Sequence, residues 1–340
     1  MSFDVDLIPF LILLSIFLTT RIRKSDTSEN YLSKENSSIM RGFSALRVIF
    51  LHVSRYYRGG LILPLFFNLG RSAVGTFYFL SSYGMMKQHI KDENYHKVFV
   101  KKRFTRVIIP YSIITAVYWV FLKLINSPVT ILETITSILQ GHPIVTYSWY
   151  ILEILILYLF FALAINTFKK DYDCIVVYTT ILSFSLMEVF RLIGQDPQWY
   201  LSIHMFAVGT LLATYEDRII KALKKYYFWF LCIGIVAGLI TIYFRNDYNI
   251  IFYQEPITIL LCILFLLRFS IKSPILTFIG DISMEVYLMQ GLCIRLVRVF
   301  IDSDNQLACI FLTFLLTVII AKILNNIFKF LFNKLFKNIF

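Results

Sequence analysis

Long apolar stretches, each close in length to a membrane-spanning helix, follow one another along most of this 340-residue chain. A spanning helix needs about 20 predominantly apolar residues. The first stretch covers 8–18, and ten more lie at roughly 39–57, 70–86, 107–125, 148–166, 174–193, 199–215, 227–244, 250–268, 281–300 and 306–328. We therefore predict an all-α polytopic membrane helix bundle with about eleven transmembrane helices.

The composition agrees with a membrane location. Hydrophobic residues make up 58% of the chain and charged residues only 16%, whereas soluble domains are nearer 45–50% apolar and about 25% charged. No internal repeat or separate soluble domain is evident. We expect one membrane domain over residues 39–340, preceded by an extra transmembrane helix and a linker in residues 1–38.

The first apolar stretch resembles a signal peptide in length but not in its flanks. Asp4 and Asp6 precede it, and the basic residues Arg21, Arg23 and Lys24 follow it, with no small-x-small cleavage site between. We interpret it as a retained helix whose N-terminus lies outside the cell.

The distribution of basic residues predicts the topology. The chain carries a net charge of +12, and cytoplasmic connections are normally enriched in Lys and Arg. The predicted inner connections hold most of them, including Arg21, Lys34, Lys87, Lys97, Lys101, Lys169, Lys170, Arg218, Lys221, Lys224 and Lys272, whereas the outer ones hold little beyond Arg58, Arg71 and Arg245. This places the C-terminus in the cytoplasm, and it explains the positive charge without a nucleic-acid partner.

The sequence motifs of several other reactions are absent from this chain. The five cysteines lie within or at the edges of apolar segments without a C-x-x-C pair, so we expect neither a metal site nor a disulfide framework. The chain has no G-x-x-x-x-G-K-[ST] loop, no H-E-x-x-H and no G-x-S-x-G elbow. ATP hydrolysis, zinc proteolysis and elbow-type hydrolysis are therefore not indicated.

Two ionisable residues, Arg41 and His52, stand in the second apolar segment. A charged side chain at the bilayer centre opposes insertion by roughly 2.5–3.5 kcal/mol, which makes such residues functional candidates. Eleven helical steps place both on one face, about 16 Å apart along the axis. The alternative is that Arg41 extends to the inner headgroups while His52 bonds a neighbouring helix.

Acidic residues in apolar segments need a partner or a proton. Glu153 and Glu285 are of this kind. Arg47 and Arg55, on the same segment as His52, are candidate partners for a carboxylate such as Glu153 or Glu188.

A basic cluster, which includes Lys102, Arg103 and Arg106, runs into the segment 107–125. The guanidinium fork suits bidentate phosphate binding, and a helix N-terminus would add to it. Anchoring to anionic lipid is the alternative. Ser81 belongs to a stretch of small hydroxyl residues that usually indicates close helix packing, and it is retained as a candidate substrate contact.

Five sequence elements, in this order, resemble the bacterial acyltransferase-3 family of membrane O-acyltransferases. The resemblance extends from about residue 39 onward. The elements are Arg41-x10-His52, the stretch Phe77 to Ser81, Arg103-x-x-Arg106 followed by Pro110-Tyr111, Trp149-Tyr150, and Gly280-x-Ile282-Ser283-x-x-x-Tyr287-Leu288.

The resemblance implies a ten-helix core, here with one added N-terminal helix, in a bacterial plasma membrane. It implies transfer of an acyl group, expected to be acetyl, from cytoplasmic acyl-CoA to a hydroxyl of a surface polysaccharide or lipid-linked glycan. Acetyl-CoA would be the donor substrate, without a metal. Arg41 would lie near the donor, with Lys102, Arg103 and Arg106 near its phosphates. His52 would act as base or acyl carrier, oriented by Glu153.

The sequence also departs from the family pattern. Ser82 replaces a usual glycine, Gln290 stands where many members have histidine, and no acidic residue precedes Arg41 within 36–40. Gln290 removes one candidate base. A transporter or flippase for a lipid-linked sugar, and an inactive subunit of a glycan-synthesis complex, are the alternatives. The sequence is compatible with an oligomer and leaves the acceptor sugar open.

Overall fold

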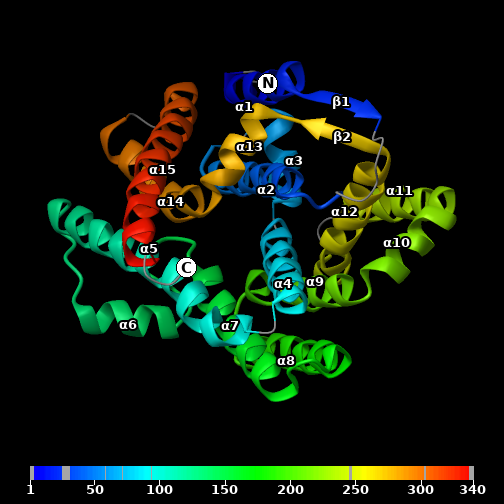
Figure 1. Ribbon diagram of the computed structural model, residues 1–340. Helices are drawn as coiled ribbons and strands as arrows, with labels where there is room; N and C mark the ends of the chain where they lie inside the picture. The colour runs from blue at the N-terminus through cyan, green and yellow to red at the C-terminus, as the bar shows by residue number, and fades with distance from the viewer. Residues whose placement is uncertain are drawn as a thin grey trace.

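The computed structural model describes residues 4–24, 31–57, 59–70, 72–92, 94–244, 247–301 and 304–336 (Figure 1). Within these ranges the chain forms fifteen α-helices, one 3-10 turn (η2, Pro197–Trp199) and two short strands. The predicted all-α polytopic class is confirmed. Arg58, Arg71 and Arg245, used above to predict the topology, lie outside the described residues.

A helix occurs at each of the eleven predicted positions. These helices are α1 (Asp4–Thr19), α2 (Lys34–Ser54), α4 (Val74–Lys91), α5 (Tyr95–Leu124), α7 (Trp149–Phe168), α8 (Tyr172–Leu192), α9 (His204–Thr214), α11 (Tyr227–Tyr243), α12 (Tyr248–Arg268), α14 (Ser283–Phe300) and α15 (Gln306–Phe336). Four shorter helices were not predicted, namely α3 (Ile62–Leu69), α6 (Ile131–Leu139), α10 (Glu216–Lys225) and α13 (Pro274–Asp281).

The length and apolarity of the helices show a multi-pass membrane protein. Among the described residues, α5, α7, α8, α12 and α15 are each long and apolar enough to cross a membrane. Two bent pairs, α10 with α11 at 90° and α13 with α14 at 78°, raise the number to as many as seven. The count of eleven crossings stays a prediction.

A small antiparallel sheet joins two distant parts of the chain. Strand β1 (Arg21–Lys24) pairs with β2 (Phe269–Lys272), so that Arg21 faces Lys272 across the pair. Figure 1 shows the two arrows side by side, next to α1. The sheet was not predicted, because each strand has only four residues and directly follows an apolar helical stretch, too short a segment for a strand pattern to stand out.

Glu216 lies at the end of the bundle that also holds the β1–β2 sheet. Its carboxylate accepts hydrogen bonds from the hydroxyls of Tyr31, at 2.6 Å, and Tyr83, at 2.7 Å, and it forms an ion pair with Lys87. We call the end of the bundle that holds the β1–β2 sheet, Glu216 and the start of α2 the basic face.

The other end, which we call the opposite face, gathers the remaining connections. The hydroxyls of Tyr56 and Tyr147 lie 2.9 Å apart, and an Arg55 Nη donates to Gln198 Oε1 at 3.2 Å. Asp6, at the start of α1, accepts backbone hydrogen bonds from the start of α3. Described residues from the predicted outer connections before α3, α7 and α9 therefore meet at this end, while the side of the membrane on which they lie stays a prediction.

Helices α2 and α13 pack with their backbones almost in contact. A Cβ added to Gly42 would lie 2.0 Å from the carbonyl oxygen of Leu276, and one added to Gly280 would lie 1.8 Å from that of Ser38. Close approach of this kind requires residues without side chains at the crossing. The pair fixes α2, and with it Arg41 and His52, against the α13–α14 corner.

A buried ion pair ties α2 to α12. Arg47 contacts Glu255 at 3.0 Å, with side-chain exposures of 3% and 1%, and it also donates to the carbonyl oxygen of Leu69. The prediction that Arg47 pairs with a carboxylate is confirmed, but its partner is Glu255 and neither Glu153 nor Glu188. A buried guanidinium must be paired and fully hydrogen-bonded, and Glu255 on α12 meets that need.

Candidate active site

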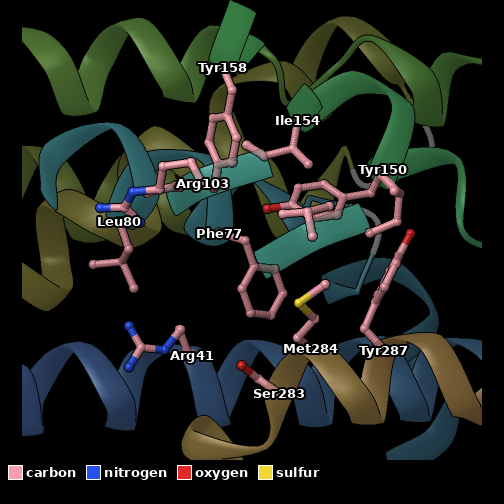
Figure 2. A pocket seen from close by; sticks show the side chains of 13 residues that line it. Arg41, Phe77, Leu80, Arg103, Tyr150, Ile154, Tyr158, Ser283, Met284 and Tyr287 are labelled. Atoms are coloured by element: carbon pink, nitrogen blue, oxygen red, sulfur yellow. Dashed lines mark hydrogen bonds between the residues drawn. The ribbon is translucent and has the colours of Figure 1, made fainter. Parts of the chain in front are cut away.

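A cavity of about 230 Å³ lies between α2, α4, α5, α7 and α14. Arg41 and Arg103 line it from opposite walls, and no acidic residue is among the described lining residues. Figure 2 shows these two side chains at one end of the cavity and Tyr150 and Tyr287 at the other. We call it the arginine cavity.

The polar groups of this cavity are held in place by tyrosines. Arg103 donates from Nε to the hydroxyl of Tyr95 at 3.1 Å. The Ser81 and Tyr158 hydroxyls lie 2.7 Å apart. Two guanidinium groups in one partly enclosed space, with hydroxyls beside them, form a surface suited to phosphate oxygens.

The structure separates the members of the basic cluster. Arg103 lines the arginine cavity, whereas Lys102 and Arg106 do not, and Arg106 is exposed. The predicted place of the cluster at a helix N-terminus is wrong, because α5 begins at Tyr95 and Arg103 stands well inside the helix. The favourable field of a helix end is confined to its first turn.

His52 lines a second, smaller cavity of about 30 Å³, which we call the histidine cavity, with Trp149, Gln198 and Tyr287 among its walls. The side chain is 5% exposed, and its Nδ1 is buried without a hydrogen-bond partner. Its ring stacks on Tyr147, with centroids 3.7 Å apart and planes inclined by 14°. His52 is therefore fixed by stacking.

Tyr287 on α14 is shared by the two cavities. It lines the arginine cavity and the histidine cavity, and its hydroxyl donates to the carbonyl oxygen of Tyr147. Arg41 and His52 consequently face the same neighbouring helix, as their spacing predicts. Tyr287 is therefore a wall common to the cationic space and to the cavity of the imidazole.

Glu153 forms no hydrogen bond with His52. It is fully buried, and one carboxylate oxygen accepts a hydrogen bond from Tyr78 while Oε1 has no partner. Tyr78 in turn packs against Tyr150, with ring centroids 4.9 Å apart. Glu153 thus supports the aromatic wall of the arginine cavity, and the structure shows no contact through which it would orient His52.

The remaining candidate pairs also differ from prediction. Arg55 donates to Gln198 and lies 5.7 Å from the ring centroid of Tyr147, rather than pairing with a glutamate. Glu188 pairs with Arg191 on its own helix, at 2.7 Å. The partners of Arg47 and Arg55 could not be predicted, because the local sequence pattern around an arginine does not indicate a partner that is distant in the sequence.

Tyr147 is the residue of this region that sequence reasoning missed. Its backbone has φ +69°, in the left-handed region that non-glycine residues rarely adopt. Such strain, of order 1–3 kcal/mol, persists where the surroundings hold it, and it is common at functional sites. Here the stack on His52 and the hydrogen bond from Tyr287 hold it. No motif in the sequence announces this turn.

Comparison with known families gives one match. The profile of an acyltransferase domain, the acyltransferase-3 type, matches residues 36–326. No curated protein and no solved structure gives a significant match. The matched range includes both cavities and all the residues that line them.

Proposed function

Because the chain belongs to the acyltransferase-3 family, we propose that it is a membrane O-acyltransferase that moves an acyl group, in the first place acetyl, from acyl-CoA to a glycan hydroxyl. The acceptor is a surface polysaccharide or its lipid-linked precursor. We further propose a bacterial plasma membrane as the location, with the N-terminus outside and the basic face in the cytoplasm.

One observation carries this proposal: Tyr287 is a common wall of the arginine cavity and the histidine cavity. An acyl-CoA molecule bears phosphates at one end and a thioester at the other. Arg41 and Arg103 offer the phosphates a cationic site. His52 lies about three helical turns further along α2, on the side where the thioester would reach.

The chemistry assigned to His52 is proton transfer. Its imidazole accepts the proton of the acceptor hydroxyl as the oxygen attacks the thioester carbonyl. The carbon–sulfur bond then breaks, and the leaving thiolate takes a proton, so that CoA departs as the thiol. General-base assistance of this kind contributes about 10²–10⁴-fold to a rate. The stack on Tyr147 restricts the imidazole to one orientation during the transfer.

The test uses the purified full-length protein in lipid nanodiscs with acetyl-CoA and a mixture of bacterial surface glycans. We expect free CoA to be released in step with acetyl groups on the glycan, detected by mass spectrometry. Translocation of a sugar lipid without CoA release would instead indicate the transporter. A protein that shows neither activity in the presence of both substrates would contradict the proposal.

A further inference from the structure

Three arginines at the opposite face lack a carboxylate partner among the described residues. They are Arg55, just after α2, and Arg295 and Arg298, near the end of α14, and all three are exposed. The outer side of a membrane protein is normally poor in arginine. Three cations there, with no carboxylate partner in the part of the chain that the structure describes, need a reason other than topology.

These arginines meet at one pair of tyrosines. The guanidinium of Arg298 lies 4.4 Å from the ring centroid of Tyr56, and that of Arg55 lies 5.7 Å from the ring centroid of Tyr147. The two tyrosine hydroxyls are 2.9 Å apart. Arg295 lies one helical turn before Arg298 on the same helix. We call Arg55, Arg295 and Arg298 the arginine rim.

The arginine rim adjoins His52. Tyr147 carries Arg55 near its ring and stacks on the imidazole. Arg55 also lines both the histidine cavity and a larger open cavity of about 390 Å³, where Ser54 and Tyr57 are among its neighbours. Arg55 is therefore a wall that the open cavity shares with the cavity of His52.

Contacts with tyrosine rings use only the face of a guanidinium and leave most of its N–H donors available. Arg295 and Arg298 stand three residues apart on α14, so their like charges lie close together, and an anion bound beside them would relieve that repulsion. A neutral glycan offers no such group. A glycan that bears a carboxylate or a phosphate does, and its neighbouring hydroxyl would then lie near the imidazole.

We propose that the arginine rim binds an anionic group, a carboxylate or a phosphate, on the acceptor glycan and so selects acidic acceptors. This proposal rests on the proposed acyltransferase function, because only that function makes the bound glycan an acceptor. Binding of the glycan itself does not require catalysis. The rim acts on substrate selection, and His52 acts on the transfer.

The experiment measures binding to the full-length protein in phosphatidylcholine nanodiscs at low salt. Three soluble probes are compared: chitotetraose, which is neutral, a hyaluronan tetrasaccharide, which carries carboxylates, and a tetramer of glycerol phosphate. We expect at least one anionic probe to bind about tenfold or more tightly than chitotetraose. Equal affinity for all three would overturn the proposal.

Variants locate the effect. Replacing Arg55, Arg295 and Arg298 together by Gln should remove the preference for the anionic probe, while Arg191→Gln, which removes an exposed arginine paired with Glu188, should leave it intact. Retention of the preference in the triple variant would overturn the assignment to the rim. Circular dichroism of each variant in nanodiscs verifies that the helices are retained.

A second arm separates an acceptor from a lipid headgroup. The protein is transferred to phosphatidylglycerol nanodiscs, and retained lipid is counted by native mass spectrometry. Retention that depends on the three arginines, together with loss of tetrasaccharide binding, would identify a lipid site and overturn the proposal. If the protein releases CoA with neutral glycans and binds anionic and neutral probes equally, the assignment of the arginine rim is wrong and the proposed function stands. If it binds anionic probes more tightly but never releases CoA, the proposed function is wrong and the rim stands.

Discussion

The imidazole of His52 lies flat against the ring of Tyr147, with centroids 3.7 Å apart. The two residues come from different parts of the chain, the end of α2 and the turn before α7, and the turn holds Tyr147 in a left-handed backbone conformation. The position of the histidine therefore depends on a local backbone geometry that a single residue supplies.

Replacing His52 by Ala should nearly abolish acyl transfer, with a loss of about 10²–10⁴-fold, because the general base is removed. The protein should still insert, and its affinity for acetyl-CoA should change little, since the arginine cavity does not include His52. Steady-state CoA release and binding of a non-hydrolysable CoA thioether measure the two quantities. Full activity in this variant would exclude the mechanism.

Tyr147 should act as a positioning residue. In Tyr147→Ala we expect kcat to fall by about three- to tenfold, the value of a lost aromatic stack, while KM for acetyl-CoA stays the same. Tyr147→Phe keeps the ring and should retain most of the activity. If Phe is as poor as Ala, the hydroxyl bonded to Tyr56 matters and the stack does not.

Substitutions of Arg103 and Arg106, the two arginines of the R-x-x-R motif, should affect the KM for acetyl-CoA to different extents. Arg103 lines the arginine cavity and Arg106 is exposed, so Arg103→Lys should raise KM for acetyl-CoA about tenfold through loss of the guanidinium fork. Arg106→Lys should change it much less. Equal effects in the two variants would mean that the donor extends beyond the described cavity.

Gly42→Ala should destabilise the protein by about 1–3 kcal/mol, because the new methyl group collides with the carbonyl oxygen of Leu276 and separates α2 from α13. Thermal unfolding in detergent measures the change. Gly84→Ala is the matched control: a Cβ there meets nothing within 4 Å. It should be neutral or slightly stabilising. Similar losses at both positions would rule out the packing explanation.

Glu216 should make stability depend on pH. Burial opposes its ionisation, but the hydrogen bonds from Lys87, Tyr31 and Tyr83 outweigh burial and lower the pKa of its carboxyl. A carboxyl with a lowered pKa stabilises the fold above its unfolded pKa, about 4.3, and this contribution is lost as pH falls through the folded pKa.

Glu216→Gln should therefore melt at a lower temperature than the wild type at pH 7, and the two should converge as the pH falls below about 4. Glu188→Gln, which breaks an exposed pair, serves as the control and should differ little from the wild type at either pH. A gap that stays constant with pH would show that the carboxylate charge is not involved.

The sequence predicts what depends on local pattern. All eleven long helices were located, because each carries a continuous apolar stretch, and the shared face of Arg41 and His52 follows from their spacing alone. Two short helices could also have been found: α6 begins with a Thr130–Glu133 capping box, and α10 runs from an acidic start to a basic end.

The partners of the polar residues could not be predicted. Arg47 meets Glu255 across 208 positions of sequence, and only the folded bundle brings α12 within reach of this side chain. Glu153 was expected beside His52, but rotation of α7 in the bundle turns it towards Tyr78. In both cases the composition shows that a partner is needed, and tertiary structure alone shows which one.

The β1–β2 pairing fastens the first helix to the junction of α12 and α13 through main-chain groups. Hydrogen bonds between peptide units do not depend on the identity of the side chains, and all four residues of β1 are exposed. A side-chain substitution within 21–24 should therefore leave this pairing in place, with proline as the exception because it lacks the N–H. The attachment of α1 to the bundle thus depends on peptide geometry at this sheet and not on the chemistry of the side chains that the sheet carries.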